Sequence, residues 1–326
     1  MKTKVCLCLY GAFCLWLPVS GASADAAAAY PERPIRVVVP FPPGGGADVT
    51  MRILSDSLKS HLGQSLVIDN RGGASTIIGT DLVAKARPDG YTILLATTTF
   101  AINPSLHATL PYDPLKDLAP ITLVAFTPYI LVVHPSLPVK TVKDLIALAK
   151  ERPGQLTYAS VGNGSATHLA TEMLVARTGI KVVHVPYKGS SPALSDLIGG
   201  HVSMYLGSMP ASVPQARSGK LRALAVTGPR RAPAAPEVPT IAESGFPGYE
   251  FASWYGLFAP AGTPPAIIDQ LRGAVRKVLE HPDMRNRMLA EGNEAVGNAP
   301  GEFAAIIRAD IAKYAKIVKA ANIKPD

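Results

Sequence analysis

Short apolar segments rich in β-branched residues alternate along the chain with longer segments in which apolar residues recur every three or four positions. The first pattern is typical of buried strands and the second of amphipathic helices. Such alternation predicts an α/β fold with a mainly parallel sheet covered by helices. We predict strands over 35–39, 66–68, 92–97, 157–160, 182–185 and 223–226, and helices over 49–62, 77–86, 142–150, 166–177 and 192–198.

Helix starts are marked by a polar residue followed by an acidic residue or proline. The pairs are Thr141 with Asp144, Ser191 with Pro192, and Thr263 with Pro264. Two further helices are predicted over 282–291 and 300–321, where we expect the chain to fold back onto its first domain.

A strand–glycine loop–helix pattern occurs twice, over 37–62 and 156–174, with extended stretches over 119–135 and 249–260. Two similar units joined by two extended crossings predict a two-domain clamp with a ligand cleft. The predicted division is 1–24 as a signal peptide, 25–127 plus 256–326 as domain 1, and 128–255 as domain 2.

The N-terminus matches an export signal. Lys2 and Lys4 precede an apolar run over 5–19, and Ala-Ser-Ala at 22–24 offers a cleavage site. We therefore expect residues 1–24 to be removed and the mature protein to be periplasmic. An uncleaved anchor is the alternative.

All three cysteines, Cys6, Cys8 and Cys14, lie inside this signal. Phe13 directly before Cys14 disfavours a lipoprotein signal. A mature chain without cysteine has no disulfide, thiolate metal site or cysteine nucleophile. The formal net charge of +8 is dispersed, which disfavours nucleic-acid binding and suits small anions.

The glycine run at Gly44–Gly46 precedes a helix and is therefore a candidate anion site. It lacks the third glycine of a dinucleotide fingerprint and the lysine of a P-loop. The second loop, 161–165, supplies neutral donors suited to a carboxylate. Glycines that serve only tight turns are the alternative for both loops.

Several stretches, in order over nearly the whole predicted mature chain, carry a resemblance to a known family. They include "YPERPIRVVVPFPPGGGADVTMRILSDSL", "YASVGNGSATHLATEML", "VPYKGSSPALSDLIGGHV" and "WYGLFAPAGTPPAII". The chain resembles the Bug-type solute-binding proteins of the tripartite tricarboxylate transporter family. The resemblance implies a type II periplasmic-binding-protein fold, with two α/β domains joined by crossing strands, and capture of a small organic acid in the cleft.

The resemblance also implies a carboxylate held between loops 41–48 and 160–168. The candidate ligand-binding residues are Phe41, Pro43, Gly44, Gly45, Asp48, Thr97, Thr98, Ser160, Gly162, Asn163, Gly164, Ser165, Thr167, His168, Tyr187, Lys188 and Ser208. A two-component membrane permease is the implied partner, with a sensor kinase as the alternative. We expect a monomer without a cofactor or metal.

Some positions keep two interpretations. Asp48 is either a helix cap or a ligand contact. Lys188 either pairs with a second carboxylate or is a solvated lysine. Trp254 and Tyr255 either pack in the core of the hinge or stack on the ligand. Ser75-Thr76-Ile77 and Ser203 depart from the family pattern, which predicts a stiffer loop at the first site. An enzyme is disfavoured because Ser165 lacks a G-x-S-x-G context and His168, on the same helix, is poorly placed as its base.

Overall fold

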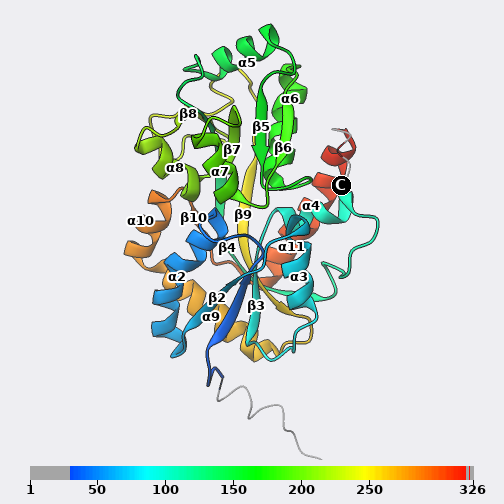
Figure 1. Ribbon diagram of the computed structural model, residues 1–326. Helices are drawn as coiled ribbons and strands as arrows, with labels where there is room; N and C mark the ends of the chain where they lie inside the picture. The colour runs from blue at the N-terminus through cyan, green and yellow to red at the C-terminus, as the bar shows by residue number, and fades with distance from the viewer. Residues whose placement is uncertain (1–29, 321–322, 324–326) are drawn as a thin grey trace, which may run out of the picture. The chain divides into compact units, whose positions relative to one another are not determined.

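Ten strands form one mixed sheet in the computed structural model, which describes residues 30–320 and 323. Eight follow in the hydrogen-bonded order β2-β1-β3-β9-β4-β7-β5-β6, and β8 and β10 also pair with β4 (Figure 1). The predicted signal, 1–24, lies outside the described residues. The strands are β1 (Ile35–Val39), β2 (Leu66–Asn70), β3 (Thr92–Thr97), β4 (Leu118–Val133), β5 (Thr157–Ser160), β6 (Val183–Pro186), β7 (Met204–Ser208), β8 (Arg222–Val226), β9 (Ala252–Pro260) and β10 (Glu294–Ala295).

Helices join most of these strands and cover the sheet. They are α2 (Gly46–Leu62), α3 (Ile77–Ala84), α4 (Thr99–Leu106), α5 (Val142–Glu151), α6 (Ala166–Thr178), α7 (Ser190–Ile198), α8 (Met209–Arg217), α9 (Pro265–Glu280), α10 (Pro282–Ala290) and α11 (Pro300–Ala320), with the 3-10 turn η1 (Ala74–Thr76) before α3. The α/β fold predicted from the alternating pattern is confirmed, and the predicted strands and helices form within a few residues of their expected bounds.

The sheet is mixed, so the prediction of a mainly parallel sheet is wrong. Within each half the pairs β1–β2, β1–β3, β5–β6 and β5–β7 are parallel. The pairs made by β4, and the pair β3–β9, are antiparallel. The difference arises because the chain passes from one half to the other and back, which adds two long strands of opposite direction.

The crossing strands β4 and β9 link the two halves of the sheet. β4 pairs with β9 as far as Pro128 and with β7 from Tyr129 onward. We call β1–β3 with α2–α4 the first half, and β5–β8 with α5–α8 the second half. The described residues from Pro31 onward pack as one compact unit, so the division into two domains at 127/128 and 255/256 stays a prediction.

Two helix starts differ from those predicted. α7 begins at Ser190 with Gly189 as its N-cap, because the Ser191 hydroxyl donates to the carbonyl of Pro43 instead of capping its own helix. The Thr263 hydroxyl donates to Pro260 O at 2.7 Å, and α9 begins two residues later at Pro265. The predicted capping box of Thr141 with Asp144 is confirmed at the start of α5.

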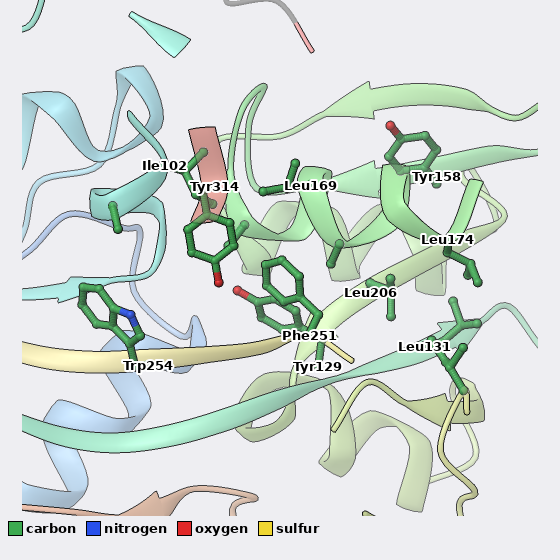
Figure 2. Packing of buried hydrophobic residues seen from close by; sticks show 14 of the residues in the cluster. Ile102, Tyr129, Leu131, Tyr158, Leu169, Leu174, Leu206, Phe251, Trp254 and Tyr314 are labelled. Atoms are coloured by element: carbon green, nitrogen blue, oxygen red, sulfur yellow. The ribbon is translucent and has the colours of Figure 1, made fainter. Parts of the chain in front are cut away.

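One apolar cluster runs through both halves and the crossing strands, and a second one lies in the second half around Leu197, Tyr205 and Val226. Figure 2 shows Tyr129, Phe251 and Trp254 on or beside these strands. Trp254 is 1 % exposed, meets Phe303 of α11 edge-on at 5.4 Å and donates its indole N–H to Asp310 Oδ2 at 2.8 Å. The last helix therefore packs against the crossing strands, beside α4.

Candidate ligand-binding site

Five strand–helix junctions meet at one cavity of about 40 Å³. The junctions are β1–α2, β3–α4, β5–α6, β6–α7 and β7–α8, and the crossing strands close the remaining wall. Strand ends followed by helix starts are where α/β folds bind ligands. The volume holds about three water-sized spheres, which is enough for a carboxylate group. The lining residues are Phe41, Gly45, Gly46, Ala47, Thr97, Thr99, Tyr129, Val161, Thr167, Ser190, Ser208, Ser253 and Tyr255.

None of these lining residues carries a charged side chain. The positive potential comes instead from the helix N-termini, each equivalent to about half a positive charge. Hydroxyl groups of serine, threonine and tyrosine supply further donors. Such a cavity favours an anion that accepts several hydrogen bonds over a cation.

Gly46 explains why the first loop contains consecutive glycines. A Cβ atom at this position would lie 2.5 Å from Ser208 Oγ, 2.5 Å from Tyr255 Oη and 2.7 Å from Ser208 Cβ. Only glycine lets the start of α2 approach β7 and β9 this closely. Gly44 has a φ of +78°, whereas Gly45 has ordinary space around it and a φ of −77°.

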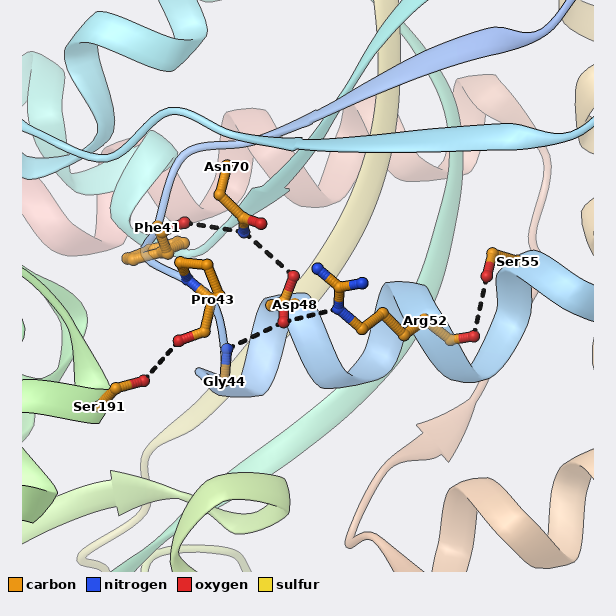
Figure 3. Close-up of polar contacts among 8 residues, drawn as sticks. All are labelled: Phe41, Pro43, Gly44, Asp48, Arg52, Ser55, Asn70 and Ser191. Atoms are coloured by element: carbon orange, nitrogen blue, oxygen red, sulfur yellow. Dashed lines mark hydrogen bonds and ion pairs between the residues drawn. The ribbon is translucent and has the colours of Figure 1, made fainter.

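Asp48 holds the first turn of α2 in place (Figure 3). Its carboxylate accepts from Gly44 N at 2.9 Å, Arg52 Nε at 2.9 Å and Asn70 Nδ2 at 3.1 Å. Burial acts to raise the pKa of Asp48, but these hydrogen bonds outweigh it and lower the pKa below its usual value. Asp48 is 2 % exposed and follows the N-cap Gly45 by three residues, so it supports the helix start without being the N-cap.

Asn70 connects this network to the neighbouring strand. Its Nδ2 atom also donates to Phe41 O at 3.0 Å. One amide group at the end of β2 therefore fixes both ends of the 41–48 loop. The amides of Gly46 and Ala47, at the start of α2, make no hydrogen bond within the described chain.

Most backbone amides of the second loop already have hydrogen-bond partners, within the loop or, for Ala166, on α4 of the first half. Gly164 N donates to His168 Nδ1 at 3.0 Å, Ala166 N to Thr99 Oγ1 at 3.2 Å, and His168 N to Ser165 Oγ at 3.4 Å. The side chain of Thr167 accepts from Val161 N at 3.0 Å. The two loops therefore differ: the amides at the start of α2 are available to a ligand, and those of 161–168 mainly shape the loop.

Ser208, the N-cap of α8, carries an unused buried hydroxyl. Its Oγ has no hydrogen-bond partner among the described residues although the side chain is 7 % exposed. A buried hydroxyl without a partner is costly. Burial also raises the pKa of Tyr129 to about 12. The phenol of Tyr129 therefore stays protonated and neutral at physiological pH.

The cavity brings together only part of the predicted set. Phe41, Gly45, Thr97, Thr167 and Ser208 line it. The other twelve do not, namely Pro43, Gly44, Asp48, Thr98, Ser160, Gly162, Asn163, Gly164, Ser165, His168, Tyr187 and Lys188. Their direct contact with a ligand stays a prediction.

Several of these residues have evident structural partners. The hydroxyl of Thr98 accepts from Trp254 N at 3.1 Å, which joins α4 to β9. Tyr187 Oη donates to Asp196 Oδ2 at 2.7 Å; burial and this carboxylate raise the pKa of Tyr187 to about 12. Lys188 is exposed. Ser203 exchanges hydrogen bonds with Thr157 between β5 and β7, so the serine has a local structural role.

Eight lining residues are outside the list of candidate ligand-binding residues: Gly46, Ala47, Thr99, Tyr129, Val161, Ser190, Ser253 and Tyr255. Gly46, Ala47 and Val161 lie inside the two predicted loops, and Tyr255 had a ligand contact as one of its two interpretations. A hydroxyl residue at the first helical position after a strand was the available signal for Thr99 and Ser190. Tyr255 lines the cavity, as a ligand contact would, whereas Trp254 lies in the core, as the alternative interpretation of this pair predicts.

Hydrogen bonds join the two halves beside the cavity. Ser191 Oγ donates to Pro43 O at 2.6 Å (Figure 3). Ser75 Oγ donates to Asn163 O at 2.5 Å, and Ala166 N donates to Thr99 Oγ1 at 3.2 Å. Both loops predicted to grip the ligand thus contact the opposite half.

Residues 50–323 match the model of the tripartite tricarboxylate transporter family receptor, TctC. The chain belongs to this family. As a TctC chain it is a solute-binding protein of the Bug type, and the resemblance found in the sequence is confirmed. Protein BugT of Bordetella pertussis (strain Tohama I) is 39 % identical over 313 residues, which are 95 % of this chain and 96 % of BugT.

Two solved structures of relatives contain a carboxylic acid. R. palustris Rpa4515 with adipate is 41 % identical, has a TM-score of 0.89, and is matched over 91 % of this chain and all (100 %) of its own. MatC from Rhodopseudomonas palustris with bound malate is 31 % identical, with a TM-score of 0.84 over 89 % of this chain and 100 % of MatC. The fold is thus that of the TctC solute-binding proteins.

Two other features of the TctC chain concern only the described residues. No helix there is long and apolar enough to cross a membrane. No group of three or more His, Asp or Glu side chains is arranged there to hold a metal ion.

Proposed function

We propose that this TctC protein captures a small organic carboxylate in the cavity between its two halves. The observation that carries the proposal is the convergence of the N-termini of α2, α4, α6, α7 and α8 on one cavity without a charged lining residue. The carboxylate accepts from the amides of Gly46 and Ala47 and from Ser208 Oγ, which have no hydrogen-bond partner among the described residues. Adipate and malate, the acids in the related structures, are the first ligands to test.

In this proposal the protein is exported, loses residues 1–24 and works in the periplasm as a monomer. Ligand binding favours the arrangement in which the halves touch, and this arrangement presents the solute to a two-component membrane permease. The ligand shifts the equilibrium only by its preference for the closed over the open form. The protein binds its solute without converting it.

A thermal-shift screen against mono-, di- and tricarboxylates tests the proposal. A ligand at a hundred times its Kd adds about 2.7 kcal/mol to the unfolding free energy, a shift of a few degrees for a protein of this size. Stabilisation by nucleotides or sugars but by no organic acid would contradict it. Chromatography of the bound acid after incubation shows whether it is recovered unchanged, as expected for a binding protein, or converted, as expected for an enzyme. Mass spectrometry of the exported protein tests cleavage after residue 24.

A further inference from the structure

Three consecutive residues other than glycine adopt left-handed backbone conformations in the turn before α3. The φ angles are 43° for Ala74, 47° for Ser75 and 78° for Thr76. Positive φ is uncommon for any residue with a Cβ and is an outlier for a β-branched residue such as Thr76. Strain of this kind persists only where neighbouring groups hold it, and it clusters at clamps and switches.

Two buried side chains of the first half donate hydrogen bonds to backbone carbonyls of the turn. Asn103 Nδ2 donates to Ser75 O at 3.0 Å, and Thr80 Oγ1 donates to Thr76 O at 2.9 Å. Asn103 and Thr80 are both 0 % exposed. Asn103 belongs to α4, whose first residue, Thr99, lines the cavity.

The strained backbone aims one side chain at the opposite half. Ser75 Oγ donates to Asn163 O, in the second loop, at 2.5 Å. A Cβ atom on Gly162 would lie 3.3 Å from Ser75 Oγ, and Gly162 has a φ of +133°. The second loop therefore leaves room for the serine, while η1 itself contributes nothing to the cavity lining.

We propose that Ser75 is a latch residue: its hydrogen bond to Asn163 stabilises the closed arrangement of the two halves and thereby raises ligand affinity without touching the ligand. The proposal rests on the opening and closing assumed in the proposed function. Opening the clamp breaks this bond, whereas the contacts of Asn103 and Thr80 lie within the first half and remain. The turn therefore keeps the Ser75 hydroxyl in position to form the hydrogen bond to Asn163 again when the protein closes.

The closed fraction can be measured directly with paired spin labels. Substitution of Cys6, Cys8 and Cys14 by serine removes the native cysteines from the full chain. Lys59→Cys on α2 and Lys143→Cys on α5 then place one exposed label in each half. Pulsed electron–electron double resonance gives the populations of short and long distances between the labels. It is measured without ligand and during titration with adipate and with malate.

Ser75→Ala should lower the ratio of closed to open protein about two- to tenfold, the range expected for one hydrogen bond. The acid concentration that half-closes the protein should rise by the same factor. Ser195→Ala is the matched control, because this exposed hydroxyl donates to Ser191 O inside its own helix. Ser75→Gly removes the hydroxyl while relieving strain and should lower the ratio as Ser75→Ala does.

A closed-to-open ratio that Ser75→Ala leaves within the range of Ser195→Ala would overturn the latch. The same holds if wild-type protein shows no closed population with or without acid. If neither acid changes the wild-type distances but Ser75→Ala still lowers the ligand-free closed fraction, the latch stands and the proposed adipate or malate binding fails. Melting temperatures of all variants identify any that unfold.

Discussion

Gly46 and Ser208 lie so close that a Cβ atom on Gly46 would come within 2.5 Å of Ser208 Oγ. One belongs to the start of α2 in the first half and the other to the start of α8 in the second. The contact brings two helix N-termini to the same point of the cavity. It also gives a physical reason for glycine at this position that neither a phosphate loop nor a tight turn provides.

Gly46→Ala should therefore weaken binding of adipate or malate about fivefold or more. The added methyl overlaps Ser208 and Tyr255, and relieving such an overlap costs typically 1–3 kcal/mol. Gly45→Ala is the matched control, since a Cβ there meets its nearest atom at 3.7 Å. Calorimetric titration of both variants checks the prediction. Equal losses in the two variants would mean that glycine flexibility, and not the contact at Gly46, decides affinity.

Ser208→Ala should weaken carboxylate binding about tenfold or more while leaving the unfolding free energy of the ligand-free protein unchanged or slightly higher. Hydrogen bonds to charged groups contribute about 1.5–3 kcal/mol, and no internal bond is lost. Ser212→Ala is the control, because Ser212 Oγ is also buried, has no partner in the described part of the chain, and lies outside the cavity lining. Titration and urea unfolding give the two quantities. Unchanged affinity in Ser208→Ala would remove this hydroxyl from the site.

The fold could be predicted from the sequence to the extent that local patterns determine it. β1, β3 and β5 begin and end at the predicted residues. Four of the five residues of β1 and three of the six of β3 are β-branched, whereas β5, with the sequence TYAS, has one. β7, with the sequence MYLGS, lacks β-branched residues and was missed, as were α4 and α8, which contain Pro104 and Pro214. Tertiary packing forms these elements against their local preference.

The candidate site could be predicted less well, for a different reason. The loops 41–48 and 160–168 could be recognised, but not which atoms of each loop face the cavity. Tyr129 and Ser253 reach the cavity only because the crossing strands pass beside it, and Ser190 only because α7 starts there. Such convergence depends on strand order, which no local pattern encodes.

Asp48→Asn should destabilise the protein by about 2 kcal/mol at pH 7, because a neutral amide cannot accept from Gly44 N, Arg52 and Asn70 together. The folded-state pKa of Asp48 lies below its usual value of 3.8. Its contribution is therefore fully present above the unfolded-state pKa and is lost as the pH falls through the folded-state value.

Urea unfolding between pH 7 and pH 3 measures this dependence. The stability difference between wild type and Asp48→Asn should shrink as the pH falls below about 4. Asp56→Asn, an exposed change on the same helix, should follow the wild type throughout. A difference that stays constant down to pH 3 would show that the charge of Asp48 does not contribute.

Asp310→Asn should stabilise the protein at pH 7, because it removes the charge of a half-buried carboxylate. Burial raises the pKa of Asp310, although the indole N–H of Trp254 and the charge of Lys313 act in the opposite direction. The folded protein therefore holds the proton more tightly than the unfolded chain, and stability decreases as the pH rises from 3.8 through the folded-state pKa. Asparagine keeps an acceptor for Trp254 Nε1 and removes the buried charge.

Urea unfolding at pH 7 and pH 3 checks this last expectation, with the exposed Asp269→Asn on α9 as control. The gain from Asp310→Asn should vanish at pH 3, where the carboxyl group is protonated in both states. A loss of stability at pH 7 would mean that the charged hydrogen bond between Asp310 and Trp254 outweighs the cost of burying the carboxylate. Since Trp254 immediately precedes the cavity residue Tyr255, such a loss would also mean that the charge on α11 helps to fix the crossing strand beside the site.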